Sequence, residues 1–186
     1  DAVDDEIFRR ILEVNVIGCV AVSQAFLPLL RIGHGRIVFM GSLAGRVASP
    51  LTGAYNASKY AVEALTDVWR MELGHVGIEV SLVEPGTVAT PIWDKALSSS
   101  DEMLSGMSQE ALAGYGRIMD AMRAWALRGT TGGIPISEVT RAVLHALSAE
   151  RPRTRYAIGR GSRLYLLLRF LPDRLRDRLI LRALGL

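Results

Sequence analysis

The sequence predicts an α/β fold in which a parallel sheet is covered by crossover helices. Two observations lead to this prediction. Amphipathic helical segments alternate with short runs rich in β-branched residues, and those runs end at glycine or proline. Parallel strands need a long return connection, usually a helix, so this alternation is typical of a parallel sheet. The chain has 186 residues, 49% of them hydrophobic and 22% charged, which is enough for one domain with a core.

The elements follow one another in a regular order. Apolar residues at helical spacing predict helices over residues 4–30, 54–74, 107–127 and 136–149. Compact apolar runs predict strands over residues 36–40, 78–83 and 155–159. Ser137 is the expected N-cap of the helix that follows it. Residues 94–133, rich in serine and glycine, form an expected substrate-loop insertion.

The composition indicates a protein of a reducing compartment. No apolar run approaches the 18 residues of a membrane span, and the acidic start of the chain is unlike a signal peptide. The single cysteine, Cys19, excludes an internal disulfide and suits a small buried apolar position. We therefore expect a cytoplasmic location, with peripheral attachment to a membrane as the alternative.

The end of the chain is strongly basic. Residues 151–186 contain ten arginines and two aspartates, so this stretch carries +8 and the rest of the chain −5, giving the net charge of +3. Leucines recur there at helical spacing, which predicts basic amphipathic helices over 161–186, interrupted at Pro172. We expect these helices to pack on the domain core with their arginines extended into solvent. Weak contact with a membrane surface is the alternative, and nucleic-acid binding is not expected.

The chemical signal lies in the helix over 54–74. Tyr55 and Lys59 are four residues apart, so both side chains project from the same helical face. An ammonium beside a phenol stabilises the phenolate and lowers its pKa, which makes the tyrosine a usable proton donor or acceptor. Ser42 stands thirteen residues before Tyr55, at the carboxyl end of a predicted strand, where open α/β sheets place their sites.

Four segments belong together, and they are Val14-Asn15-Val16-Ile17-Gly18, Gly41-Ser42-Leu43-Ala44-Gly45, Tyr55-Asn56-Ala57-Ser58-Lys59 and Pro85-Gly86-Thr87-Val88-Ala89-Thr90. Together these segments resemble the short-chain dehydrogenase/reductase family, and the segment 41–95 resembles its hydroxysteroid and retinol dehydrogenase branch. They stand in the family's order and at compatible spacings. The resemblance implies a Rossmann-like, doubly wound parallel sheet, with a catalytic domain over residues 1–160.

The resemblance also implies the roles of individual residues. Tyr55 would be the general acid or base, Ser42 would orient the substrate oxygen, and Lys59 would lower the pKa of Tyr55 and bind the nicotinamide ribose. Asn15 would hold a water linking Lys59 to solvent. The cofactor is expected to be NAD or NADP, held by Asn15, Tyr55, Lys59, Pro85, Gly86, Val88 and Thr90. Ser42, Tyr55 and Trp93 are the expected substrate contacts.

The sequence departs from the family at its start, because the glycine-rich βαβ half that binds the cofactor's pyrophosphate is not found. We expect either a fragment of a longer gene product or a truncated paralogue, and in both cases an unpaired edge on the strand at 36–42. A second interpretation is a non-catalytic scaffold that associates through the helices at 4–30 and 54–74. A third is a peripheral membrane-binding module based on 161–186.

The expected substrate is a lipophilic alcohol or its ketone or aldehyde. Methionine-rich walls suit adaptable apolar pockets, and the insertion contributes such side chains. They are Ile92, Trp93, Met103, Leu104, Met107, Met119, Met122 and Trp125. The resemblance implies homo-oligomers through the helices at 4–30 and 54–74. His34, His75 and His145 have no ligand spacing, so no metal site is expected.

Overall fold

A computed structural model describes residues 5–94, 97–98 and 108–186 of the chain. The first half contains α1 (Asp5–Leu12), η1 (Glu13–Ile17), α2 (Gly18–Ile32), β1 (Arg36–Met40), η2 (Leu43–Gly45), α3 (Gly53–Gly74) and β2 (Glu79–Pro85). The second half contains α5 (Gln109–Gly132), α6 (Ile136–Ser148), β3 (Arg155–Ile158), α7 (Ser162–Leu167), η3 (Leu168–Phe170) and α8 (Asp173–Leu184). The helices and strands that the hydrophobic pattern predicts are all present.

The three strands form one parallel sheet in the order β1-β2-β3. Ile37 lies opposite Val80, and Val83 lies opposite Tyr156. The central strand β2 is buried at five consecutive positions, as expected for a strand covered on both faces. In the described part of the chain no strand pairs with the outer side of β1. The predicted parallel sheet is therefore confirmed.

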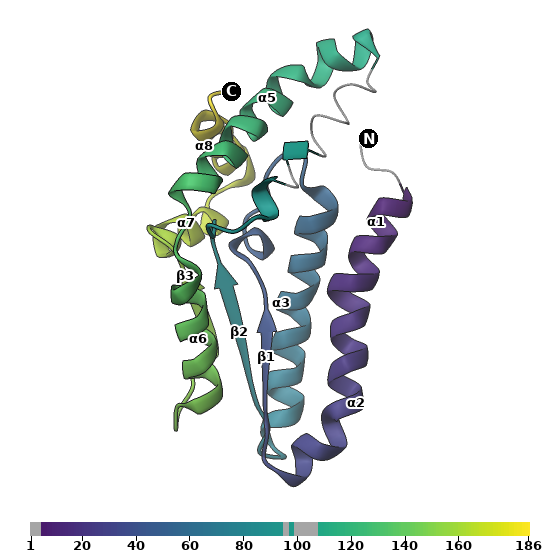
Figure 1. The fold of residues 1–186 in the computed structure, drawn as a ribbon, viewed down its shortest axis with the longest axis vertical. Helices are drawn as coiled ribbons and strands as arrows, with labels where there is room; N and C mark the ends of the chain where they lie inside the picture. The colour runs from purple at the N-terminus through teal and green to yellow at the C-terminus, as the bar shows by residue number, and fades with distance from the viewer. Residues whose placement is uncertain (1–4, 95–96, 99–107) are drawn as a thin grey trace.

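Helices cover both faces of the sheet (Figure 1). On one side α2 and α3 pack over a core cluster of Ile37, Phe39, Val62, Leu73, Ile78, Val80 and Leu82. Cys19 is partly buried against this cluster, in the apolar role that its sequence context predicts. On the other side α6 covers Val83 and Tyr156 with Ala146. These two clusters hold the sheet between the helices and so position the ends of its strands.

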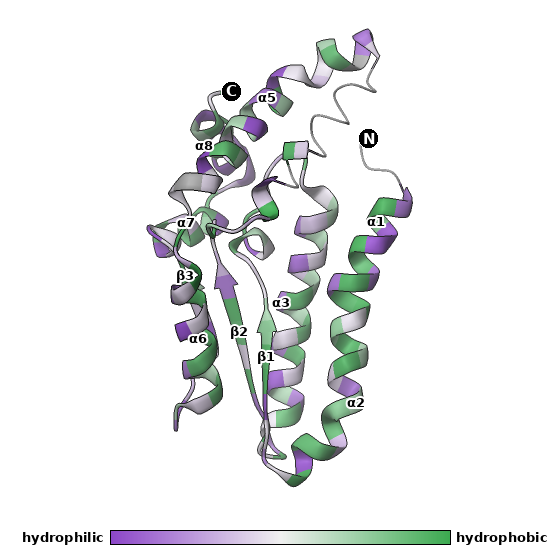
Figure 2. Ribbon diagram, in the orientation of Figure 1, coloured by the Kyte–Doolittle hydropathy of each residue, from purple (hydrophilic) through white to green (hydrophobic). Residues whose placement is uncertain are grey.

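The first helical segment is rich in apolar residues (Figure 2). Its exposed apolar residues include Val14, Ile17, Val22, Phe26, Leu29 and Ile32. Residues Asp5–Ile32 form the one helical stretch, among the residues described, that is long and apolar enough to cross a membrane by length and composition. This differs from the expectation of no such segment, which counted only uninterrupted apolar runs. One near-terminal helix of this kind is weak evidence for a span, because helices of soluble domains pass the same test.

The helix of the predicted insertion is longer than expected. The helix predicted over 107–127 continues to Gly132 as α5. Two glycines at its end allow close packing on the loop after β2. A Cβ on Gly129 would lie 2.9 Å from the Trp93 ring, and a Cβ on Gly133 would lie 2.5 Å from the amide nitrogen of Ala89. Of the side chains expected in this insertion, Met103, Leu104 and Met107 lie outside the described residues.

The predicted N-cap of α6 is wrong. Pro135, not Ser137, occupies the cap position, and its side chain makes no capping hydrogen bond. The physical reason lies one residue earlier, because Ile134 forms a parallel bridge with Val88. Its amide donates to the Thr87 carbonyl (2.9 Å) and its carbonyl accepts from Ala89 (3.0 Å). The chain is therefore held through Ile134, and the helix begins directly after Pro135.

The basic end of the chain forms helices interrupted at Pro172, as predicted. Its first part is attached to the domain, because Ser162 is buried and the Tyr165 hydroxyl donates to the Val47 carbonyl (3.5 Å). The last helix differs from expectation, since α8 contains no buried residue and Leu175 and Leu179 are exposed. The prediction that the leucines of the basic end are buried on the domain core is therefore wrong for α8.

Candidate active site

Ser42 lies where β1 ends. The carboxyl ends of β1 and β2 are adjacent in the parallel sheet, so the segments after them share one edge of the sheet. Ser42 is the N-cap of η2, and its Oγ accepts a hydrogen bond from the Ala44 amide (3.1 Å). The same hydroxyl donates to the Pro85 carbonyl oxygen at 3.4 Å. This second bond is long, so a ligand oxygen could replace the Pro85 carbonyl as the acceptor of the Ser42 hydrogen bond.

Tyr55 and Lys59 occupy the first two turns of α3. The Lys59 ammonium lies 5.7 Å from the centre of the Tyr55 ring, which places the two side chains beside each other as predicted. Lys59 Nζ also donates to the Met40 carbonyl oxygen (2.9 Å), at the end of β1. Burial lowers the pKa of Lys59, and the neighbouring Cys19 opposes this effect. Tyr55 remains 39% exposed, so this residue is not sealed inside the core.

The backbone around Asn15 is a π-helical turn, η1. Such turns are rare and are frequently found at functional sites. Asn15 Nδ2 donates to Ser58 Oγ (3.1 Å), and Ser58 Oγ donates to the Tyr55 carbonyl oxygen (2.7 Å). Ser58 is fully buried. The sequence interpretation did not assign Ser58 to the site, although its position three residues after Tyr55 could have indicated it. It joins Asn15 to the tyrosine helix.

The loop after β2 is held from two sides. The Gly86 amide donates to the Ile158 carbonyl oxygen (2.8 Å), which fixes the loop to the end of β3. The parallel bridge to Ile134 engages the residues on either side of Val88, so the Val88 backbone groups face the opposite way. There the Trp93 indole donates to the Val88 carbonyl oxygen (2.7 Å). The predicted cofactor residue Pro85 thus ends β2, and Gly86, Val88 and Thr90 lie on the anchored loop that follows it.

Trp93 is a packing residue in this structure. Its ring stacks edge-to-face with Trp125 of α5, with 5.0 Å between ring centres. Contact with a substrate, which the sequence predicts for Trp93, stays a prediction. Among the residues that the structure describes, no three His, Cys, Asp or Glu side chains form a group able to hold a metal ion.

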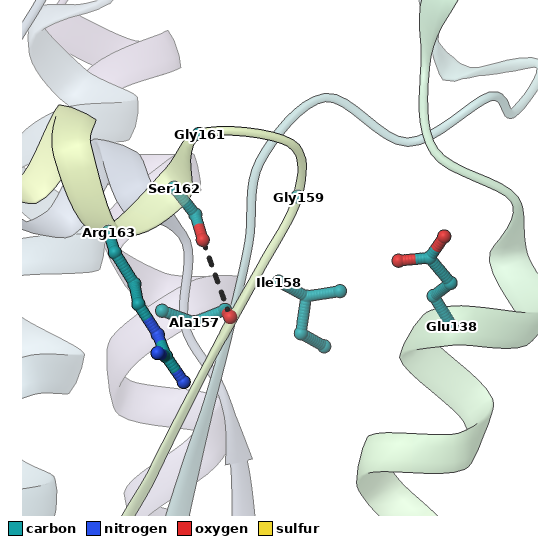
Figure 3. A pocket seen from close by; sticks show the side chains of 7 residues that line it. All are labelled: Glu138, Ala157, Ile158, Gly159, Gly161, Ser162 and Arg163. Carbon is teal, nitrogen blue, oxygen red and sulfur yellow. Dashed lines mark hydrogen bonds between the residues drawn. The ribbon is translucent and has the colours of Figure 1, made fainter.

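A separate hollow of about 370 Å³ lies at the end of β3 (Figure 3). Glu138 of α6 stands on one side of the strand, and Arg163 of α7 stands on the other. Its lining includes none of Asn15, Ser42, Tyr55 and Lys59. The candidate catalytic residues therefore lie outside this hollow.

Comparison with known proteins identifies the family. The family model described as short chain dehydrogenase matches residues 1–101, more than half of the chain. The chain belongs to this family, so the predicted resemblance is confirmed.

Curated relatives agree with this assignment. 17-beta-hydroxysteroid dehydrogenase type 6 of Bos taurus is 35% identical over 186 residues, covering 96% of this chain and 57% of the relative. Retinol dehydrogenase 16 of Mus musculus is 38% identical over 178 residues, covering 93% and 56%. 3-amino-tetrahydro-pyrrolizinone reductase of Xenorhabdus hominickii is 37% identical over 152 residues, covering 81% and 53%. The chain spans about half the length of these relatives.

Solved structures confirm the Rossmann-like fold. A short chain dehydrogenase from Burkholderia cenocepacia, in complex with NADP, matches with a TM-score of 0.66 and 25% identity, over 95% of this chain and 60% of that one. A short-chain dehydrogenase from Streptomyces avermitilis matches with a TM-score of 0.67 and 23% identity, over the same shares. The second likeness concerns the fold alone.

Proposed function

We propose that this chain is the catalytic part of an NAD- or NADP-dependent oxidoreductase that interconverts a lipophilic alcohol and its ketone or aldehyde. One observation carries the proposal. Tyr55 stands beside Lys59, and the ammonium of Lys59 is tied to the strand end that leads into Ser42. Family membership supports this interpretation. The roles below are those that the arrangement would allow these residues to perform.

In this proposal Tyr55 is the residue that transfers the proton. During reduction its phenol donates a proton to the substrate oxygen, and during oxidation the phenolate accepts the proton of the alcohol. Ser42 donates a hydrogen bond to the same oxygen and stabilises the negative charge that develops there. Its hydroxyl can do so by leaving the long bond to Pro85. The two residues project from adjoining segments, the loop after β1 and the first turn of α3.

Lys59 and Asn15 support the tyrosine. Burial disfavours the charged form of Lys59. The hydrogen bond from its ammonium to the Met40 carbonyl and a phenolate at Tyr55 would both oppose this effect and favour the charged form. Asn15 is fixed by Ser58, which also bonds the backbone of Tyr55. The distance between the helices that carry Asn15 and Tyr55 is thereby constrained. A water held by Asn15 would link Lys59 to solvent.

The residues at this sheet edge fit the nicotinamide end of a dinucleotide. The Val88 amide faces away from Ile134, and no bond to it is found among the residues described. It is available to a carboxamide, while Lys59, Tyr55 and Asn15 would hold the ribose. The nicotinamide ring supplies or accepts the hydride when it is bound. The described residues contain no glycine-rich strand-to-helix turn for the pyrophosphate, so only this end of the cofactor is accounted for.

Two further assignments rest on the relatives and on the exposed surface. The names hydroxysteroid and retinol dehydrogenase belong to relatives that act on lipophilic alcohols, which favours that substrate class here. Association between copies through α1–α2 and α3 is supported by the uncovered apolar side chains of the first helical segment. A cytoplasmic location, with peripheral membrane attachment as the alternative, stays a prediction.

The test compares two tyrosines of α3 in the intact protein that contains residues 1–186. Tyr55→Phe should lower kcat for ketone reduction by about 10² to 10⁴ while cofactor affinity is kept, because only the titrating oxygen is removed. Tyr60→Phe is the matched control, since Tyr60 is an exposed tyrosine on the same helix. Retention of a tenth of the wild-type kcat by Tyr55→Phe would show that Tyr55 is not the general acid.

A further inference from the structure

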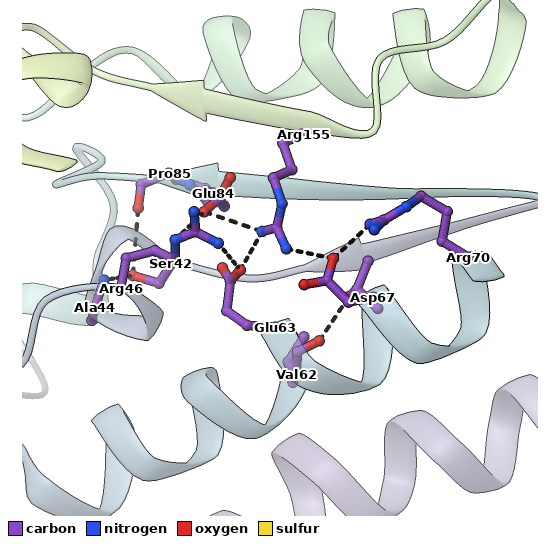
Figure 4. Close-up of polar contacts among 11 residues, drawn as sticks. Ser42, Ala44, Arg46, Val62, Glu63, Asp67, Arg70, Glu84, Pro85 and Arg155 are labelled. Atoms are coloured by element: carbon purple, nitrogen blue, oxygen red, sulfur yellow. Dashed lines mark hydrogen bonds and ion pairs between the residues drawn. The ribbon is translucent and has the colours of Figure 1, made fainter. Parts of the chain in front are cut away.

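Six charged side chains form a network beside the candidate site (Figure 4). They come from four segments and are Arg46, Glu63, Asp67, Arg70, Glu84 and Arg155. Arg46 donates to Glu63 Oε2 (2.8 Å), and Arg155 donates to the same oxygen and to Asp67 (2.7 Å). Asp67 also accepts from Arg70 (2.5 Å). The network therefore connects α3 to the outer strand β3 and to residues 41–46, the loop after β1 that carries Ser42 and is called the serine loop below.

Two carboxyl groups in this network are buried with incomplete partners. Glu63 is 6% exposed and Glu84 is 1% exposed. Oε1 of each group is buried without a hydrogen-bond donor, and the nearest arginine nitrogens to Glu84 Oε1 stand at 3.6 and 3.8 Å. Two such acceptors are costly when both groups are ionised. One proton on the pair would give one carboxyl group a donor.

The electrostatics of the pair agree with this arrangement. The pKa of Glu84 is raised to about 7, first by burial and then by the nearby charge of Glu63. Arg155 and Arg46 oppose the rise. The groove beside Glu84 is also lined by charged or titratable groups of other elements, which are Glu138, Arg141, His145, Arg153 and Arg163.

The network is connected to Ser42 at two points. Arg46 follows η2, whose N-cap is Ser42, and Glu84 precedes Pro85, whose carbonyl accepts from the Ser42 hydroxyl. The serine loop also sits directly on α3. A Cβ on Gly45 would lie 2.7 Å from the Lys59 carbonyl oxygen and 3.1 Å from Glu63 Cγ. Movement of either carboxyl group would therefore be transmitted to the loop that carries Ser42.

We propose that Arg46, Glu63 and Glu84 are positioning residues for Ser42, and that the Glu63–Glu84 carboxyl pair holds the serine loop in place while sharing one proton. Loss of that proton leaves two buried carboxylates gathered around the same two arginines, Arg46 and Arg155. Their repulsion pushes the end of β2 away from Glu63, and with it the Pro85 carbonyl that Ser42 contacts. The proposal rests on the function proposed above for its catalytic meaning, but the shared proton and its effect on the loop are measurable without activity.

The first experiment uses carboxyl-carbon NMR of the intact protein labelled with ¹³C-glutamate, over about pH 5 to 9. A protonated carboxyl should be present near pH 6, and its loss should move the Ser42 and Ala44 amide signals in parallel. Glu84→Gln should abolish both titrations, since a neutral amide replaces the protonated acid. Glu79→Gln is the control, because Glu79 lies on the same strand but is exposed. Absence of a titrating buried carboxyl in the wild-type protein would overturn the proposal even if no variant folds.

The second experiment is the pH profile of kcat and KM. Arg46→Leu should lower kcat by about tenfold to a hundredfold with a smaller change in KM for the cofactor, because displacement of a reacting group costs rate. Arg46→Lys should restore part of the loss. Glu84→Gln should remove one titration from the kcat profile, and Glu79→Gln should not. An unchanged profile in Glu84→Gln would contradict the positioning role. The two proposals can fail separately. If the buried carboxyl group titrates and the Ser42 and Ala44 signals move with it, but the protein has no dehydrogenase activity, the proposed function is wrong and the shared proton of Glu63 and Glu84 is still supported.

Discussion

Lys59 makes the best-defined contact of the candidate site. Its ammonium lies beside the Tyr55 ring and is bonded to the carbonyl of Met40, so one side chain connects the tyrosine helix to the end of β1. Burial costs this cation part of its hydration, and the carbonyl bond recovers some of it. Lys59 is therefore part of the packing as well as of the proposed chemistry.

Replacement of Lys59 should affect both roles. Lys59→Ala in the intact protein should lower kcat by about 10² or more and also weaken NAD(H) or NADP(H) binding, because the charge beside Tyr55 and a ribose contact are both lost. Steady-state kinetics and cofactor titration by calorimetry would measure the two effects. Full cofactor affinity in Lys59→Ala would contradict the ribose contact while leaving the role toward Tyr55 open to the kinetic test.

The buried acid Glu84 makes stability depend on pH. Its pKa is about 7 in the folded protein against 4.5 for an ordinary glutamate, so between these values the folded state binds the extra proton. Stability should then fall as the pH rises from about 4.5 to about 7, by roughly 3 kcal/mol at about 1.4 kcal/mol for each tenfold change in proton affinity. Denaturant unfolding at several pH values would measure this, with Glu84→Gln expected to lack the decline. Parallel curves for the two proteins would exclude Glu84 as its source.

At the scale of elements, the sequence predicts the helices and strands, whose apolar residues recur at a regular spacing. It does not predict features that depend on contacts between residues far apart in the sequence. The strands and the helices around the sheet follow from apolar periodicity, and the order of four motifs gives the family. Ser137 was misplaced as an N-cap because Ile134 is held by Thr87 and Ala89, a contact across about 45 residues of sequence. Ser58 was missed because its partner, Asn15, comes from another helix.

The last helix gives an element-scale prediction. Because α8 has no buried residue, deletion of residues 173–186 should change the melting temperature of the intact protein little. Loss of binding to anionic vesicles in the same variant, together with weaker wild-type binding at high salt, would indicate a membrane-surface role for its arginines. A large drop in melting temperature would instead show that the contact of α8 with α5, or with another copy, contributes to stability.

At the scale of the whole molecule, β1 is the edge at which the described sheet stops. Its outer side has no partner strand in the described part of the chain, and the chain covers about half the length of the curated relatives. The residues proposed for the nicotinamide end of the site lie within the described part of the chain, and no glycine-rich strand-to-helix turn for the pyrophosphate is found in that part. The division agrees with the departure seen in the sequence.

This division predicts the behaviour of residues 1–186 expressed alone. The isolated chain should bind NAD(H) and NADP(H) weakly or not at all, because the helix N-terminus that receives phosphate is not among its described elements. Calorimetry on the isolated chain would test this, with the intact protein as the positive control. Micromolar affinity of the isolated chain would show that the pyrophosphate is held elsewhere.

The π-helical turn at Glu13–Ile17 has a consequence for the phase of the helix around it. A π-turn accommodates one more residue than an α-helical turn, so α1 and α2 are offset by about 100° from the relation that an uninterrupted helix would give them. Deletion of one residue from this turn would convert it to ordinary helix and leave the faces that α1 and α2 present to their neighbours unchanged. Phe8 and Ile11 would keep their orientation, but within the turn itself Asn15 would turn away from Ser58. A single codon lost here would alter the site as much as a substitution within it.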